Sequence, residues 1–339
     1  MPARRLRLPL DPYLLCLIAT VALAFVLPAR GRATLVLDKT VYGAVAALFF
    51  LYGAKLSPSA IWEGLIHWRL QALVSASTFV LFPALGVAVG VLAKSRLPDD
   101  VVTGLVFLTL LPSTVQSSIA FTSIARGNVP AALCSASLSN MAGVFITPIL
   151  AALITPAGKG LSLSSLSDIC LQIVLPFIAG QVCRPFIGAW LSRHLRITAA
   201  VDRGSILLIV YSAFGAGVAS GLLKSVSGVT LLAILGVDLA MLAIVIVSTT
   251  WISRQLGMST ADEIAIVFCG SKKSMASGIP MANILFAGHA VGLIVLPLMI
   301  FHQAQLFVCA TLARRYAARP KEDGAPAAER GLNPVGAFR

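Results

Sequence analysis

Two adjacent lysines in the stretch FCGSKKSMASGIPMA, residues 268–282, are the side chains of this sequence best suited to chemistry. Lys272 and Lys273 stand among serines inside an apolar segment, where an ammonium group needs a partner. Asp238 lies near the middle of another apolar segment. Three roles stay open for these charges: a structural Lys–Asp ion pair, a proton-carrying site, and a lysine that contacts an anionic substrate.

Short polar side chains accompany the lysines and recur near a second interrupted segment, LLPSTVQSS, residues 110–118. Small polar residues in membrane helices serve packing as well as binding, so their grouping beside the interruptions is what favours binding. A weaker polar cluster, His302, Gln303 and Gln305, follows later in the chain. The candidate substrate- and ion-binding residues are Gln116, Ser117, Ser118, Ser135, Asn140, Asp238, Ser271, Lys272, Lys273 and Ser274.

Motifs of the common enzyme and nucleotide sites are missing from the sequence. CGSKKS superficially resembles a phosphate-binding loop, but Val267 stands where that loop needs its upstream glycine, and no Gly-Lys step follows. There is no HExxH, no GxSxG and no metal-ligand spacing of His or Cys. We therefore expect a protein that is not an enzyme and that has no metal site and no cofactor.

The composition is that of an integral membrane protein. Of the 339 residues 58% are hydrophobic and only 12% are charged, whereas soluble domains carry roughly a quarter of charged residues. The mean hydropathy is +0.92. The net charge of +13 comes from Lys and Arg in short loops and at the termini. Such charges set membrane topology, and they form no basic stripe that would bind nucleic acid.

Long continuous apolar runs predict an all-α membrane protein with ten transmembrane helices. The predicted spans are residues 12–29, 40–56, 71–93, 101–125, 128–154, 167–188, 204–222, 228–252, 262–286 and 290–313. The excess of Lys and Arg in alternate loops predicts both termini in the cytoplasm, with the chain in the bacterial inner membrane. Residues 58–70 read as an amphipathic helix at the cytoplasmic interface, and residues 319–339 as a disordered tail.

The order of the spans indicates an internal duplication. Residues 8–160 hold five spans and residues 161–318 the other five, so the odd number gives the two repeats opposite orientations. Spans four and nine are interrupted at matching places, by Pro112 within residues 110–118 and by Gly278 and Pro280, helped by Gly270, within residues 268–280. Matched broken helices in inverted repeats predict a transporter binding site near mid-membrane.

Three segments of the chain resemble the bile acid:sodium symporter superfamily, and its SBF-like subgroup most of all. They are TSIARGNVPAALCSASLSNMAGVFITPIL (122–150), DEIAIVFCGSKKSMASGIPMANILF (262–286) and PLMIFHQAQLFVCATLARRYA (297–317). The resemblance covers about residues 8 to 318. It implies a panel domain of spans one, two, six and seven, and a core domain in which broken spans four and nine cross. It also implies alternating-access transport of small organic anions, often with sodium.

The residues that bind sodium in coupled members of that family are replaced here. Aligned on Ser274, the family's Glu falls on Phe268 and its Gln on Lys272, and Ser117 and Ser118 stand where a Ser-Asn pair is expected. We expect Lys272 or Lys273 to take the place of the ion, so that transport of the anion is sodium-independent or coupled to protons. The alternatives are a sodium-coupled symporter and a membrane sensor that binds without transporting.

Overall fold

The computed structural model describes residues 12–55, 67–155, 170–219 and 226–319, and within these ranges every regular element is a helix. Seven of these helices are long and apolar enough to cross a membrane, and eight if the bent pair of residues 99–124 counts as one span. The first and ninth predicted spans are not among them, because one is shorter and the other is interrupted. The count of ten therefore stays a prediction. The interfacial helix at 58–70 and the tail lie almost wholly outside the described residues.

The helices overlap every predicted span, but the second and the seventh begin earlier than predicted, at Arg32 and at Leu195. In chain order they are α1 (Pro12–Val26), α2 (Arg32–Lys55), α4 (Trp68–Ala76), the π-helical turn η1 (Ser77–Leu81), α5 (Phe82–Ala93), α6 (Asp99–Leu110), α7 (Val115–Ile124), α8 (Val129–Ile154), the π-helical turn η3 (Cys170–Val174), α10 (Leu175–Arg193), α11 (Leu195–Ala219), α12 (Gly228–Gln255), α13 (Thr260–Gly270), α14 (Met275–Leu285) and α15 (Val291–Ala317).

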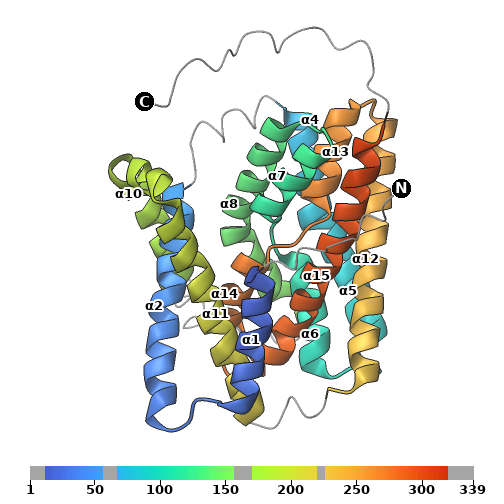
Figure 1. Ribbon diagram of the computed structural model, residues 1–339. Coiled ribbons are helices and arrows are strands. Elements are labelled where there is room, and N and C mark those ends of the chain that lie inside the picture. Colours follow the sequence, from blue (N-terminus) through green and yellow to red (C-terminus); the bar gives the residue numbers. More distant parts are fainter. Residues whose placement is uncertain (1–11, 56–66, 156–169, 220–225, 320–339) are drawn as a thin grey trace, which may run out of the picture.

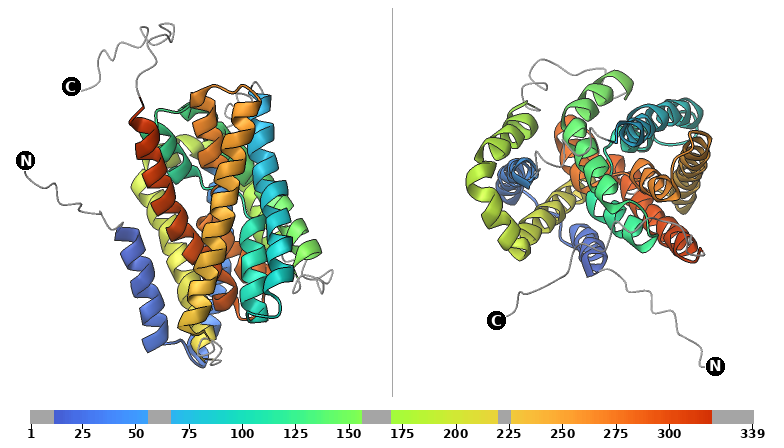
Figure 2. Two further views of the ribbon diagram at one scale, coloured as in Figure 1. Left: turned by 90° about the vertical axis from the view of Figure 1, so that its right-hand side faces the viewer. Right: turned by 90° about the horizontal axis from the view of Figure 1, so that it is seen from above.

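The helices form two groups that lie side by side (Figures 1 and 2). The panel group consists of α1, α2, η3, α10 and α11, and the core group holds the remaining helices. This grouping agrees with the expected panel and core. Helices α2 and α10 touch backbone to backbone, because a Cβ at Gly53 would collide with the carbonyl of Phe177 and one at Gly180 with the carbonyl of Phe50.

Two helices of the core group are broken, as the sequence predicts. Helix α6 ends at Leu110 and α7 begins at Val115, with a bend of 60° between them. Pro112 lies in this first break, where it cannot continue the hydrogen-bond ladder. In the second break α13 ends at Gly270, and α14 begins at Met275. The lysines therefore lie in extended chain between two half-helices.

The second break lies within the predicted residues 268–280, directly after Gly270, but the part expected of Gly278 and Pro280 was wrong. Gly278 and Pro280 lie inside α14 and do not interrupt it. Gly278 instead makes room for a neighbour, since a Cβ there would collide with the side chain of Leu111. Pro280 removes the N–H that would bond to the Ala276 carbonyl one turn earlier, so it frees a backbone acceptor near the start of α14.

Candidate functional site

The two breaks bond directly to each other at the centre of the core group. The backbone N–H of Ser274 donates to the carbonyl of Pro112 at 2.9 Å. The hydroxyl of Thr114 donates to the carbonyl of Lys273, also at 2.9 Å. Backbone groups that leave a helix inside a membrane must find partners within the protein. Here each break supplies partners for the other, which fixes their crossing.

Lys273 fills the space between the breaks with its ammonium group. Its Nζ donates to the carbonyls of Thr109 at 2.7 Å, Leu111 at 2.8 Å and Thr78 at 2.9 Å. These bonds use all three donors of an ammonium. The Nζ also lies 4.2 Å from the ring centroid of Phe82, and the side chain is fully buried. A positive charge is thus held entirely by neutral oxygens and an aromatic face.

The acceptors of Lys273 come from irregular backbone. Thr109 and Leu111 belong to the end of α6, where the last carbonyls have no partner within the helix and carry the negative end of the helix dipole. Thr78 belongs to the π-helical turn η1, a local departure from α-helical bonding. A lysine placed on such a set of carbonyls occupies a position in which an inorganic cation could otherwise bind.

A cavity of about 310 Å³ lies between the panel group and the crossing. We call it the crossing cavity. Residues at the start of both half-helices line it: Thr114, Val115 and Gln116 at α7, and Ser274, Ala276 and Ser277 at α14. Helix N-termini present unbonded N–H groups and a partial positive charge, which favours anions. The apolar part of the lining comes mainly from Phe49, Leu133, Met141, Val144 and Phe177.

Comparison with known proteins decides the family. The model of the SBF-like CPA transporter family matches residues 11–318. The chain belongs to the SBF-like CPA transporter family. It is 52% identical to "Uncharacterized protein PA2026" of Pseudomonas aeruginosa, with 94% of this chain and 96% of that protein covered. It is 51% identical to "Putative symporter YfeH" of Escherichia coli, with 91% and 93% covered.

A more distant relative extends the likeness to vertebrates. "Sodium/bile acid cotransporter 7" of Xenopus tropicalis is 31% identical over 277 residues, with 80% of each chain covered. The family and the apolar helices make this protein a multi-pass membrane transporter related to the bile acid:sodium symporters, as the sequence motifs indicated.

Lys272 of this SBF-like transporter is placed very differently from its neighbour. Its side chain is fully buried, yet its Nζ donates no hydrogen bond to any described residue. The Nζ lies 4.0 Å from the ring centroid of Phe121 and 5.4 Å from that of Phe268. Cation–π attraction is therefore the contact that holds it. Neither lysine lines the crossing cavity.

The serines near the breaks mostly donate to carbonyls in the last turn of α13. The hydroxyl of Ser118 donates to the Phe268 carbonyl at 3.0 Å, and that of Ser271 to the Val267 carbonyl at 2.6 Å. Ser113, which sequence analysis did not single out, donates to the Cys269 carbonyl at 2.6 Å. These hydroxyls hold the second break together, so they are engaged in structure.

The remaining candidates separate into cavity-lining and buried residues. Gln116, Asn140 and Ser274 line the crossing cavity, and Asn140 also donates to the Ser113 carbonyl at 2.7 Å. Ser117 and Ser135 have buried hydroxyl oxygens that bond to none of the described residues. Both carboxylate oxygens of Asp238 are likewise buried without a hydrogen bond to the described part of the chain, and Asp238 forms no ion pair with Lys272 or Lys273 there.

Two further residues bond to the second break and its half-helix but were not among the candidate binding residues. Gln305 of α15 holds the backbone of Lys273: its Oε1 accepts from the Lys273 N–H at 2.9 Å, and its Nε2 donates to the Lys273 carbonyl at 3.1 Å. Tyr52 of α2 crosses from the panel side, with its hydroxyl 3.1 Å from Asp202 and 3.3 Å from the Ala276 carbonyl that Pro280 leaves free. In the sequence, Gln305 belongs only to the weaker polar cluster, and no sequence pattern points to Tyr52.

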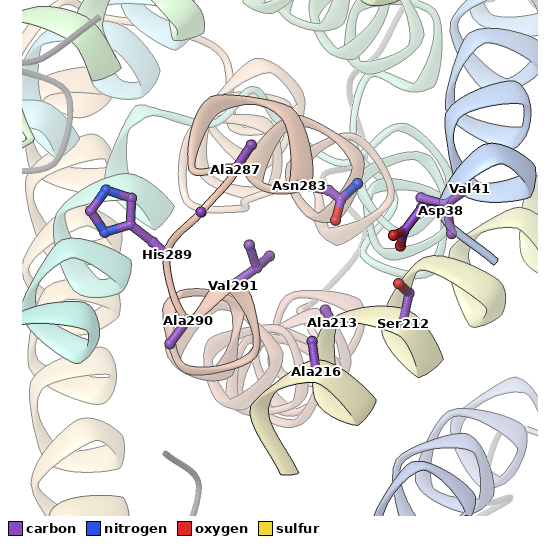
Figure 3. A pocket seen from close by; sticks show the side chains of 11 residues that line it. Asp38, Val41, Ser212, Ala213, Ala216, Asn283, Ala287, His289, Ala290 and Val291 are labelled. Carbon is purple, nitrogen blue, oxygen red and sulfur yellow. The ribbon is translucent and has the colours of Figure 1, made fainter. Parts of the chain in front are cut away.

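A second hollow, of about 530 Å³, lies at the opposite end of α14 (Figure 3). We call it the distal cleft. It is lined by residues from α2, α11, α14 and the turn between α14 and α15. Helices α2, α11 and α14 therefore contribute to both hollows. For example, Lys55 and Asp202 line the crossing cavity, and Asp38 and Ser212 line the distal cleft. The eleven-residue α14, about 16 Å long, separates the two.

Proposed function

We propose that this protein is a secondary transporter of a small organic anion, which binds in the crossing cavity. The observation that carries the proposal is the meeting of two helix N-termini in one cavity with an extensive apolar lining. The N-termini of α7 and α14 suit an acidic group, and the apolar lining suits an organic body. The hollows at the two ends of α14 support alternating access, with the panel and the core moving against each other.

We propose further that the anion binds without sodium at the crossing. The three carbonyls that could coordinate a cation there already bond to the Lys273 ammonium. The fixed charge would compensate the partial negative charge at the end of α6 as a bound ion does in a sodium-coupled carrier. The family's essential Glu position holds Phe268, which fits a site that needs no additional metal ligand.

The finer architecture belongs to the same proposal. Residues 8–160 and 161–318 would be inverted repeats of five spans each, with α6–α7 and α13–α14 as the corresponding broken spans. The direct bonding between the two breaks supports this assignment. We place both termini in the cytoplasm of a bacterial inner membrane, from the distribution of Lys and Arg.

The experiment is a ligand screen followed by flux. Purified protein is melted with a panel of small organic anions in sodium chloride and in choline chloride, and hits are tested for saturable, trans-stimulated uptake into proteoliposomes. We expect at least one organic anion to raise the melting temperature of the protein by the same amount in both salts. Ser137→Phe should abolish its effect by filling the crossing cavity, whereas Leu138→Phe, the next residue of α8 and outside the cavity lining, should not. Uptake that is unchanged in the Ser137→Phe variant would contradict the assignment of the anion to the crossing cavity.

A sodium-coupled symporter is the second candidate, because relatives are named sodium/bile acid cotransporter. In that case the hit would stabilise the protein only in sodium chloride, and uptake would require a sodium gradient.

A further inference from the structure

The distal cleft gathers three oxygen-bearing side chains from three helices. Asp38 comes from α2, Ser212 from α11 and Asn283 from α14. Figure 3 shows them grouped in one part of the cleft, with the Asp38 carboxylate and the Ser212 hydroxyl turned toward each other. Two of these helices belong to the panel group and one to the core, so the cluster spans the boundary between the two groups.

None of the three side chains is engaged elsewhere in the protein. Within the described ranges, Asp38, Ser212 and Asn283 form no side-chain hydrogen bond, and Asp38 forms no ion pair. The cleft lining contains no Lys or Arg, and His289 is its other ionisable residue. A carboxylate, a hydroxyl and an amide therefore face an open volume without a positive partner.

Two helix ends of opposite partial charge border the distal cleft. The C-terminal end of α14, at Asn283 and the turn through Gly288, carries the partial negative charge of its last carbonyls. The N-terminal end of α15, at Ala290 and Val291, carries a partial positive charge. The two ends offset each other, so the negative character of the cleft comes from the Asp38 carboxylate.

We infer that the distal cleft binds a monovalent cation through the oxygens of Asp38, Ser212 and Asn283. Carboxylate, amide and hydroxyl oxygens are the ligands of hard cations, and a single carboxylate offers too little charge for a tight divalent site. The bound cation joins α2 and α11 of the panel to α14 of the core, and so favours the conformation in which these helices are close. This inference is independent of the anion site, because it places a cation away from Lys273.

The test is thermal unfolding of the purified full-length protein in the absence of any organic anion. Choline chloride is replaced stepwise by sodium chloride, potassium chloride or methylammonium chloride, at constant ionic strength and fixed pH. We expect a saturable rise in melting temperature with at least one of these cations. A response to alkali ions identifies an inorganic cation, and a response to methylammonium alone identifies the ammonium group of a solute.

A matched pair of variants, with a third beside it, tests whether the cation binds in the distal cleft. Asp38→Asn keeps the shape of an exposed side chain and should weaken the apparent cation affinity at least tenfold. Asp99→Asn removes an acidic group from the neighbouring hollow, which is lined by Lys94, Asp99 and Asp100, and should leave the response unchanged. Ser212→Ala gives a smaller loss in the same direction as Asp38→Asn.

The inference is overturned if the wild type melts alike in all four salts, or if Asp38→Asn responds as the wild type does. A response lost in Asp99→Asn but kept in Asp38→Asn also overturns it. Failure of the anion proposal looks different, because it leaves the cation response intact while no organic anion stabilises the protein.

Discussion

Lys272 and Lys273 are neighbours in the chain and are equally buried, yet their ammonium groups have opposite surroundings. Lys273 donates to three carbonyls, whereas Lys272 lies against the rings of Phe121 and Phe268 without a hydrogen bond. The difference arises because both residues lie in a break, where adjacent side chains diverge. It teaches that the local backbone, and not the residue type, decides which lysine bonds to the carbonyls.

The largest effect is expected from Lys273→Met. This change leaves the carbonyls of Thr78, Thr109 and Leu111 without their donor inside the protein. Each buried unsatisfied group costs about 1–3 kcal/mol, so the total loss is on the order of 5 kcal/mol. Size-exclusion chromatography and thermal unfolding in detergent should show aggregation or a much lower melting temperature. A variant that melts within about 2 °C of the wild type would contradict the structural role of Lys273.

A cation should partly rescue Lys273→Ala. The shorter side chain opens a space that faces three carbonyl oxygens, which suits a small cation. Sodium or methylammonium should raise the melting temperature of this variant more than that of the wild type. Both proteins are compared with Asp38→Asn also present, so that binding at the distal cleft does not contribute. Equal responses would show that the Lys273 position is no cation site.

A moderate effect is expected from Gln305→Leu. Gln305 bonds to both the N–H and the carbonyl of Lys273, and its loss leaves the second break less firmly held. Removing these partners should cost about 1–3 kcal/mol in unfolding free energy. The control is Gln303→Leu on the same helix, which should cost less than half as much. If the two variants lose the same stability, the bonds to Lys273 contribute nothing of their own.

The smallest effect is expected from Lys272→Met. The change gives up a cation–π contact, worth about 2 kcal/mol where it is desolvated, but it also removes a buried charge with no hydrogen-bond acceptor. The two effects oppose each other, so thermal unfolding should place this variant close to the wild type and far above Lys273→Met. A loss as large as that of Lys273→Met would show that the two lysines share one role.

Sequence patterns predicted the helices and the breaks because apolar length and Pro112 act locally. They misplaced Pro280, because a proline inside a helix and a proline that breaks one look alike in sequence. The partners of Lys273 were out of reach, since main-chain carbonyls of Thr78, Thr109 and Leu111 leave no trace in residue types. Phe268 and Lys272 stand where the family has its Glu and Gln, which left Lys272 and Lys273 both open as the residue in place of the ion, and only the folded chain shows that Lys273 bonds to the carbonyls. Tyr52 and Gln305 depend on helices that meet only in the folded chain.

The central claim is that the Lys273 ammonium takes the place of a bound cation at the crossing of the two breaks. Its most direct test is the dissociation constant of the best anion from the screen, titrated into Asp38→Asn protein in sodium chloride and in choline chloride. The account predicts values that agree within about twofold, since a difference of 1.4 kcal/mol would already be tenfold. Binding at least about tenfold weaker without sodium would contradict it.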